Sequence, residues 1–110
     1  MDFDWERVTA FQRRVLEALL EVPRGRVTTY GRLARRIGCR SPRAVGQALG
    51  ENPFAPAVPC HRVISASLRL GGFGHSTTSE NLDRKRHLLQ AEGVVFGADG
   101  KLADRARLWP

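Results

Sequence analysis

Apolar residues recur with helical spacing in four segments of the chain. Thr9 can cap a first helix that continues to about Glu21, and the turn at Pro23-Arg24-Gly25 ends it. The residues that this spacing places on the inner face of the helix are Phe11, Val15, Leu16, Leu19 and Leu20.

Two further short helices are predicted next, separated by a tight turn. The first follows Thr29, and Gly38 suits its left-handed C-terminal cap. The second begins after Ser41, with Pro42 in its first turn, and ends near Gly50. Two short helices with arginine on the second are typical of a helix-turn-helix, although many helical hairpins bind nothing.

The second half of the chain contains shorter elements. Val63-Ile64 predicts a short buried strand, and residues 71–79 form a loop rich in glycine, serine and threonine. A last helix is predicted over about 80–92. Residues 94–102 have the pattern of a small hairpin. The predicted fold class is therefore mainly α with a small β-hairpin, and a helix-turn-helix of winged-helix type.

The size and composition of the chain limit its architecture and its location. A chain of 110 residues suits one domain, which we expect to span 1–110 without a separate N-terminal domain. No apolar run approaches the roughly 20 residues of a membrane span. The acidic start, Met1 to Glu6, lacks the layout of a signal peptide. We therefore expect a cytoplasmic monomer that does not associate with membranes.

The charge balance points to a class of partner. Eighteen Lys and Arg against eleven Asp and Glu leave a net charge of +7, and only Lys85 and Lys101 are lysines. Arginine forms forked hydrogen bonds to phosphate and stacks on bases. A small, arginine-rich basic domain thus favours a nucleic-acid partner, while solubility or adaptation to a harsh habitat would explain the same charge.

The chain contains two cysteines, Cys39 and Cys60, which we expect to be reduced in a cytoplasmic protein. Cys39 falls in the turn of the helix-turn-helix and is predicted to have no role. The sequence lacks a second Cys/His cluster at the spacing of metal ligands, so we expect neither zinc nor another cofactor.

The segment from Pro59 to Ile64 carries the strongest chemical signal. It places His61 beside Cys60. A thiol becomes a strong nucleophile only as thiolate, and an imidazole can take its proton directly or through water. A carboxylate can orient the imidazole, and Glu92 at the end of the last helix is a candidate. The alternative is a buried structural cysteine beside an ordinary histidine.

Five motifs occur in a fixed order around this segment, and together they resemble a known family. The pattern resembles the C-terminal, DNA-binding and active-site domain of the O6-alkylguanine-DNA alkyltransferases, over about residues 8 to 96. The motifs are Val27-Thr28-Thr29-Tyr30-Gly31-x-Leu33-Ala34, Arg43-Ala44-Val45-Gly46-x-Ala48-Leu49, Asn52-Pro53, Pro59-Cys60-His61-Arg62-Val63-Ile64 and Leu88-Leu89-x-x-Glu92-Gly93.

The resemblance implies roles for the residues around the thiol. Cys60 corresponds to the cysteine that accepts the alkyl group, His61 to the histidine that activates it through water, and Glu92 to the glutamate that orients the histidine. Tyr30 corresponds to the tyrosine near the flipped base, whose hydroxyl can help guanine leave as a neutral species. From the residues alone, Tyr30 could instead be a core residue with a solvated hydroxyl, and Glu92 a helix-end residue.

The resemblance also implies a DNA-contacting surface on the third helix, which in this family enters the minor groove. Arg43 corresponds to the arginine that fills the place of the flipped base, and it could alternatively be a phosphate clamp. The small residues Ala44 and Gly46 would allow close approach to the groove. Gln47 and Ser41 complete the predicted DNA-binding set.

A second group of residues is predicted to shape the pocket. Asn52 corresponds to an asparagine that braces the turn before the cysteine, although it could be only a turn former. Lys85 corresponds to a lysine behind the pocket, although a solvated lysine is the usual case on a helix. Pro59, Val63 and Phe73 complete this set, and Phe73 stands where the active family often has tyrosine.

Two function hypotheses follow. The first is a protein that transfers alkyl groups irreversibly from O6-alkylguanine in double-stranded DNA to Cys60. The second is an alkyltransferase-like protein, a related group that usually has tryptophan or alanine in place of this cysteine. Such a protein binds the lesion and marks it for nucleotide excision repair proteins. A plain transcription regulator would explain the helix-turn-helix but not the Cys-His motif.

Overall fold

The structure is a computed structural model, and it describes residues 3–54, 57–71 and 79–109. Within these residues the chain is mainly helical, with one two-stranded sheet. The elements in chain order are η1 (Trp5–Arg7), α1 (Ala10–Leu20), β1 (Thr28–Thr29), α2 (Tyr30–Arg36), α3 (Pro42–Gly50), η2 (Cys60–Arg62), β2 (Val63–Ile64), α4 (Ser79–Ala91) and η3 (Arg105–Arg107), where η denotes a 3₁₀ helix.

The first helix, α1, begins where its cap predicts. Thr9 Oγ1 accepts a hydrogen bond from the Gln12 backbone N–H at 3.1 Å, and Gln12 Oε1 accepts one from the Thr9 N–H at 2.8 Å. This reciprocal capping box satisfies two backbone donors that the helix cannot pair internally. The inner face differs from the prediction at its end, because Ala18 is buried while Leu20 is 40% exposed. Leu20 is the last residue of α1.

The predicted helix-turn-helix is present as α2 and α3, which pack against each other and against α1. Thr29 caps α2, and Ser41 caps α3 by accepting a hydrogen bond from the Ala44 N–H at 3.1 Å. Gly38 has φ of +70° in the turn between the helices, as a left-handed cap requires. The local signals in the sequence are therefore confirmed.

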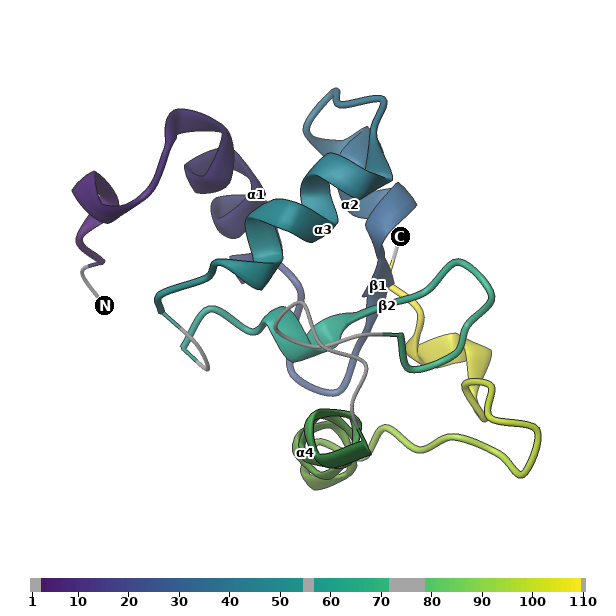
Figure 1. The fold of residues 1–110 in the computed structure, drawn as a ribbon. Helices are drawn as coiled ribbons and strands as arrows, with labels where there is room; N and C mark the ends of the chain where they lie inside the picture. Colours follow the sequence, from purple (N-terminus) through teal and green to yellow (C-terminus); the bar gives the residue numbers. More distant parts are fainter. Residues whose placement is uncertain (1–2, 55–56, 72–78, 110) are drawn as a thin grey trace.

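The two strands join the helix-turn-helix to the segment that contains Cys60. β1 and β2 pair in parallel, with Thr28 opposite Val63 and Thr29 opposite Ile64. Successive side chains of a strand point to opposite faces. Accordingly, Val63 packs in a core cluster with α1, α2 and α3, whereas Ile64 packs in a second cluster with Leu89 of α4. Figure 1 shows the result, with α1–α3 on one side of the strands and α4 on the other.

The end of the chain closes the structure around β1. After α4 the backbone reverses at Gly93, whose φ is +84°. The predicted hairpin has one antiparallel bridge, between Phe96 and Leu102, with hydrogen bonds from the Gly97 N–H to the Lys101 carbonyl at 2.8 Å and from the Ala103 N–H to the Val95 carbonyl at 3.1 Å. The two-stranded sheet is the parallel β1–β2 pair. The Trp109 N–H then donates to the Val27 carbonyl at 2.7 Å. No helix in the described part of the chain has the length and apolar character needed to cross a bilayer.

The turn of the helix-turn-helix permits a test with two matched glycines. A Cβ added at Gly38 or at Gly31 would meet no atom within 4 Å. The effect of each substitution therefore reports the conformational preference of the backbone and not a steric clash. We expect Gly38→Ala to lower the free energy of unfolding by about 1 kcal/mol, because its φ is positive. Gly31→Ala, within α2, should raise it by roughly 0.5 kcal/mol. Urea unfolding measures both changes in the free energy of unfolding. Changes of the same sign in the two variants would contradict this account.

Candidate active site and nucleic-acid interface

Cys60 lies at the start of η2, directly before β2. Its thiol is free and half-buried, and it packs against the core cluster formed by α1, α2 and α3. The preceding Pro59 is buried, and the Cys60 N–H donates to the Val58 carbonyl at 2.9 Å. The backbone around the thiol is therefore held from both sides, by the tight turn before it and by the β1–β2 pairing after it.

His61 pairs with Glu92 in the protein interior. The distance from His61 Nε2 to Glu92 Oε2 is 2.8 Å, and the side chains are 4% and 6% exposed. A carboxylate accepts hydrogen bonds, so this contact favours the tautomer that carries its hydrogen on Nε2. Nδ1 is then the basic nitrogen. It is buried and makes no hydrogen bond within the described residues.

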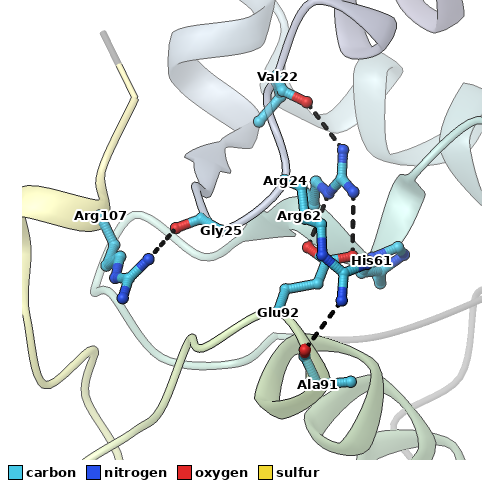
Figure 2. Close-up of polar contacts among 8 residues, drawn as sticks. All are labelled: Val22, Arg24, Gly25, His61, Arg62, Ala91, Glu92 and Arg107. Atoms are coloured by element: carbon cyan, nitrogen blue, oxygen red, sulfur yellow. Dashed lines mark hydrogen bonds and ion pairs between the residues drawn. The ribbon is translucent and has the colours of Figure 1, made fainter.

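Arg62 completes this group, and the sequence analysis assigned it no role. Its Nε donates to Glu92 Oε1 at 2.9 Å, and its Nη2 donates to Oε2 at 3.0 Å. Burial alone would raise the pKa of Glu92, but the hydrogen bonds from Arg62 and His61 outweigh burial and lower it to about 2. Figure 2 shows the three side chains converging at the end of α4. The signal in the sequence that could have indicated a role for Arg62 is its position within the motif around Cys60.

The thiol and the imidazole are both biased toward their neutral forms. Burial raises the pKa of Cys60, although a hydrogen bond from Asn52 and the charge of Lys85 act against this. Burial lowers the pKa of His61, and the pairing with Glu92 offsets only part of that effect. At neutral pH the resting pair is therefore a thiol beside a neutral imidazole that can still accept a proton.

Asn52 and Lys85 support the segment that leads to the thiol. Asn52 Nδ2 donates to the Val58 carbonyl at 3.1 Å, and Asn52 Oδ1 accepts from the Phe54 N–H at 2.9 Å. Lys85 is fully buried, and its Nζ donates to the Val63 carbonyl at 2.6 Å. Burial lowers the pKa of Lys85 to about 8. Asn52 is thus a brace within its loop, and Lys85 does not lie on the solvated face of α4.

Residues predicted to contact DNA line a shallow groove beside α3. The groove has a volume of about 410 Å³ and is lined by Tyr30, Pro42, Arg43, Gly46 and Gln47. Burial raises the pKa of Tyr30, and the negative charge of an ionised Cys60 raises it further. Tyr30 and Cys60 pack against the same core cluster.

The remaining predicted site residues are placed differently. Ser41 uses its hydroxyl to cap α3, and Ala44 lines a neighbouring hollow of about 320 Å³ between α1 and α3. Phe73 lies outside the described residues. Cys39 contacts Ser41, whose N–H donates to the sulfur at 3.4 Å. Within residues 3–54, 57–71 and 79–109, no three His, Cys, Asp or Glu side chains form a cluster that could hold a metal ion.

Comparison with known proteins decides the family. The family described as 6-O-methylguanine DNA methyltransferase, DNA binding domain, matches residues 10–94. The chain belongs to this family. A relative in the methyltransferase family, the methylated-DNA–protein-cysteine methyltransferase of Mycobacterium bovis, is 47% identical over 107 residues. That match covers 94% of the chain and 62% of the relative, so the chain spans less than two thirds of the length of this methyltransferase.

Two solved structures of the family resemble the fold. The crystal structure of Mycobacterium tuberculosis OGT in complex with DNA has a TM-score of 0.69 and 49% identity, and the match covers 76% of this chain and 50% of that one. The crystal structure of S. pombe Atl1 in complex with damaged DNA containing O6-carboxymethylguanine has a TM-score of 0.76 and 30% identity. The latter match covers 100% of this chain and 99% of Atl1.

The low pKa of Glu92 predicts how acid affects stability. Glu92 titrates at about 2 in the folded chain against 4.5 without the fold, so its contribution is complete above about pH 4.5 and is lost as the pH falls toward 2. Glu92→Gln should lower the free energy of unfolding at pH 7 by a few kcal/mol and should flatten its decline in acid.

Urea unfolding at pH 7, 5, 4 and 3 checks this expectation. Glu17→Gln is the matched control, because Glu17 is half exposed and pairs with Arg13 on the same face of α1 at 3.3 Å. Its effect should stay within about 0.5 kcal/mol at every pH. An unchanged acid decline in Glu92→Gln would show that the carboxylate is not held as the structure indicates.

Proposed function

We propose that this chain repairs O6-alkylguanine in double-stranded DNA by accepting the alkyl group on Cys60. The observation that carries the proposal is the buried His61–Glu92 pair, which leaves His61 Nδ1 without a hydrogen-bond partner among the described residues, on the residue that follows the half-buried free thiol of Cys60. A thiol of raised pKa needs such a proton acceptor to become nucleophilic. The names of the relatives, methylated-DNA–protein-cysteine methyltransferases, agree with this chemistry.

The groove beside α3 is the proposed route by which the lesion reaches the thiol. O6 of guanine is held within the base stack, so a nucleophile can attack its alkyl carbon in line only after the base is flipped out. Flipping costs a few kcal/mol, and less for a poorly pairing lesion. We infer that α3 enters the minor groove, that the exposed Arg43 takes the vacated place, and that Tyr30 lies beside the flipped base. Support comes from the groove that joins these residues and from the DNA complexes of two structural relatives.

The proposed transfer conserves atoms and charge. The proton of Cys60 passes to Nδ1 of His61, directly or through a water molecule. The thiolate then attacks the alkyl carbon, an S–C bond forms, and the bond from carbon to O6 breaks with its electron pair remaining on the guanine. The guanine takes up one proton, for which the Tyr30 hydroxyl is the nearby relay, and His61 returns its proton to that relay. The thioether is stable to water, so each protein molecule acts once.

A second function, lesion recognition without transfer, is favoured by one observation. The match to S. pombe Atl1 extends over the whole of this chain and nearly the whole of Atl1, whereas the matched methyltransferase is longer. In this alternative the groove binds the lesion, Cys60 stays unmodified, and excision repair proteins act on the marked site. The two functions predict similar DNA binding, and they differ in the fate of the sulfur.

The fate of Cys60 separates the two functions directly. We expect a duplex that contains one O6-methylguanine to add one methyl group to the peptide that contains Cys60, in a one-to-one ratio of DNA to protein. Mass spectrometry of the digested protein measures the gain. Bound lesion without a mass gain would leave only the recognition function.

Cys60→Ala is the control for this experiment. It should abolish the mass gain, because the acceptor sulfur is gone, while lesion binding persists. A collapse of binding in Cys60→Ala would mean that the thiol is a structural part of the groove. In that case the mass gain of the protein without the substitution is the measurement that separates the two functions.

The role of Arg43 predicts a difference between duplex and single-stranded DNA. Stacking of a side chain on a base is worth about 1–3 kcal/mol, so Arg43→Ala should weaken binding to lesion duplex by roughly tenfold or more. Single-stranded lesion DNA has no vacated place in a duplex stack, so its binding should change much less. Arg40→Ala removes a charge from an exposed residue of the adjoining turn and should weaken both forms alike. Equal losses for the two DNA forms in Arg43→Ala would indicate a phosphate contact instead.

A further inference from the structure

Arg62 holds together three segments that are distant in sequence. Its Nη1 donates to the Val22 carbonyl at 2.9 Å, just after α1, while Nε and Nη2 donate to the two carboxylate oxygens of Glu92, just after α4. Arg62 itself lies in η2, next to His61. Its side chain is only 15% exposed. Figure 2 shows the guanidinium between the Val22 carbonyl and the Glu92 carboxylate.

The geometry of this contact fixes the orientation of the carboxylate. The Nε and Nη2 groups of a guanidinium form a rigid fork that matches both oxygens of a carboxylate. Glu92 Oε2 accepts from Arg62 Nη2 at 3.0 Å and contacts His61 Nε2 at 2.8 Å. A carboxylate held in this way cannot rotate away from the ring. The hydrogen of the neutral imidazole therefore stays on Nε2, and Nδ1 stays the proton acceptor.

The charge of Arg62 has a second effect on His61. A carboxylate alone would stabilise the protonated imidazole, which could no longer accept a proton. The charged groups that act on His61 are Lys85 from α4, Glu92 just after α4 and Arg62 from η2. The titratable Cys60 directly precedes His61 in the chain. Glu92 favours the protonated ring, whereas Arg62 and Lys85 disfavour it. The guanidinium thus offsets part of the effect of the carboxylate while leaving its hydrogen bond in place.

We propose that Arg62 is a positioning residue for alkyl transfer, which by clamping Glu92 keeps His61 neutral with Nδ1 free to accept the proton of Cys60. The inference rests on the proposed function for its kinetic consequence only. The state of the His61 ring can be measured whether or not transfer occurs. A result against the role of Arg62 can therefore be distinguished from a result against alkyl transfer to Cys60.

The decisive measurement is the titration and tautomer of His61 by nitrogen-15 NMR, with His61→Gln identifying its signals. In Arg62→Gln the protonation midpoint of His61 should rise by about one pH unit, because Glu92 then acts on the ring without a counter-charge. The rate of single-turnover methyl transfer should be measured as a function of pH. The midpoint of its fall at low pH should rise by the same amount in Arg62→Gln. Below both midpoints, a shift of one unit costs about tenfold in rate.

Two further variants make the test specific. Arg24→Gln is the matched control, because Arg24 donates to the Ala91 carbonyl at 3.0 Å, immediately before Glu92, whereas the dashed contacts to the carboxylate in Figure 2 come from His61 and Arg62. It should leave the His61 midpoint unchanged. Arg62→Lys keeps the charge but lacks the fork, so the midpoint should stay near the original value while a fraction of the ring carries its hydrogen on Nδ1.

Each outcome bears on the proposal. A raised midpoint in Arg62→Gln with an unchanged one in Arg24→Gln supports it. An unchanged midpoint in Arg62→Gln, whatever happens to stability, would overturn it, because Arg62 would then be only a structural tie. Should Arg62→Gln not fold, Arg62→Lys decides, and a ring that keeps its hydrogen wholly on Nε2 would sink the idea.

Discussion

The pairing of the buried Glu92 carboxylate with His61 and Arg62 is the interaction on which the site depends. A buried carboxylate without partners costs several kcal/mol, so this residue requires hydrogen-bond donors from elsewhere in the fold. His61 and Arg62 supply them, and both belong to the short helix that begins with Cys60. Pairing the charge at the end of α4 therefore also positions the thiol. The same contacts connect α4, η2 and, through the Val22 carbonyl, the end of α1.

A second constraint connects this charged group to the groove beside α3. Parallel pairing of β1 with β2 aligns Thr29 with Ile64, so the segment that starts α2 and the segment that follows Cys60 are fixed relative to each other. Tyr30 opens α2 directly after the first of these strands. A strand pair of only two residues each would be marginal alone. Here it is stabilised because its side chains are buried in the two core clusters that lie on either side.

The groove and the buried polar group lie in different parts of the molecule. The groove is lined by Tyr30 and by residues of α3, whereas the His61–Glu92 pair is enclosed between η2 and the end of α4. Burial raises the pKa of the Cys60 thiol and lowers the pKa of the His61 imidazole, so both groups are biased toward their neutral forms. A neutral thiol is a weaker nucleophile than a thiolate, which limits unproductive reactions of the sulfur.

The sequence by itself determined the elements that depend on near neighbours. Capping by Thr9 and the left-handed turn at Gly38 involve residues at most five positions apart, so local patterns are sufficient to predict them. The motif around Cys60 placed His61 beside the thiol and made Glu92 a candidate partner of the ring, and the structure pairs the two residues. Local patterns do not report, however, how completely a helix face is covered, and Leu20 was therefore placed inside although it is exposed.

Only the tertiary structure decided the contacts between distant segments. Lys85 reads as a solvated helix residue, and its burial against the Val63 carbonyl depends on how α4 packs on β2. The fork from Arg62 to Glu92 joins residues 30 positions apart. The parallel sheet pairs β1 with β2, two segments distant in sequence, in addition to the bridge within the local hairpin. The physical reason is common to all three. The free energy of a buried charge or a strand pair depends on the groups that surround it after folding. These groups cannot be predicted from the residues that are its neighbours in sequence.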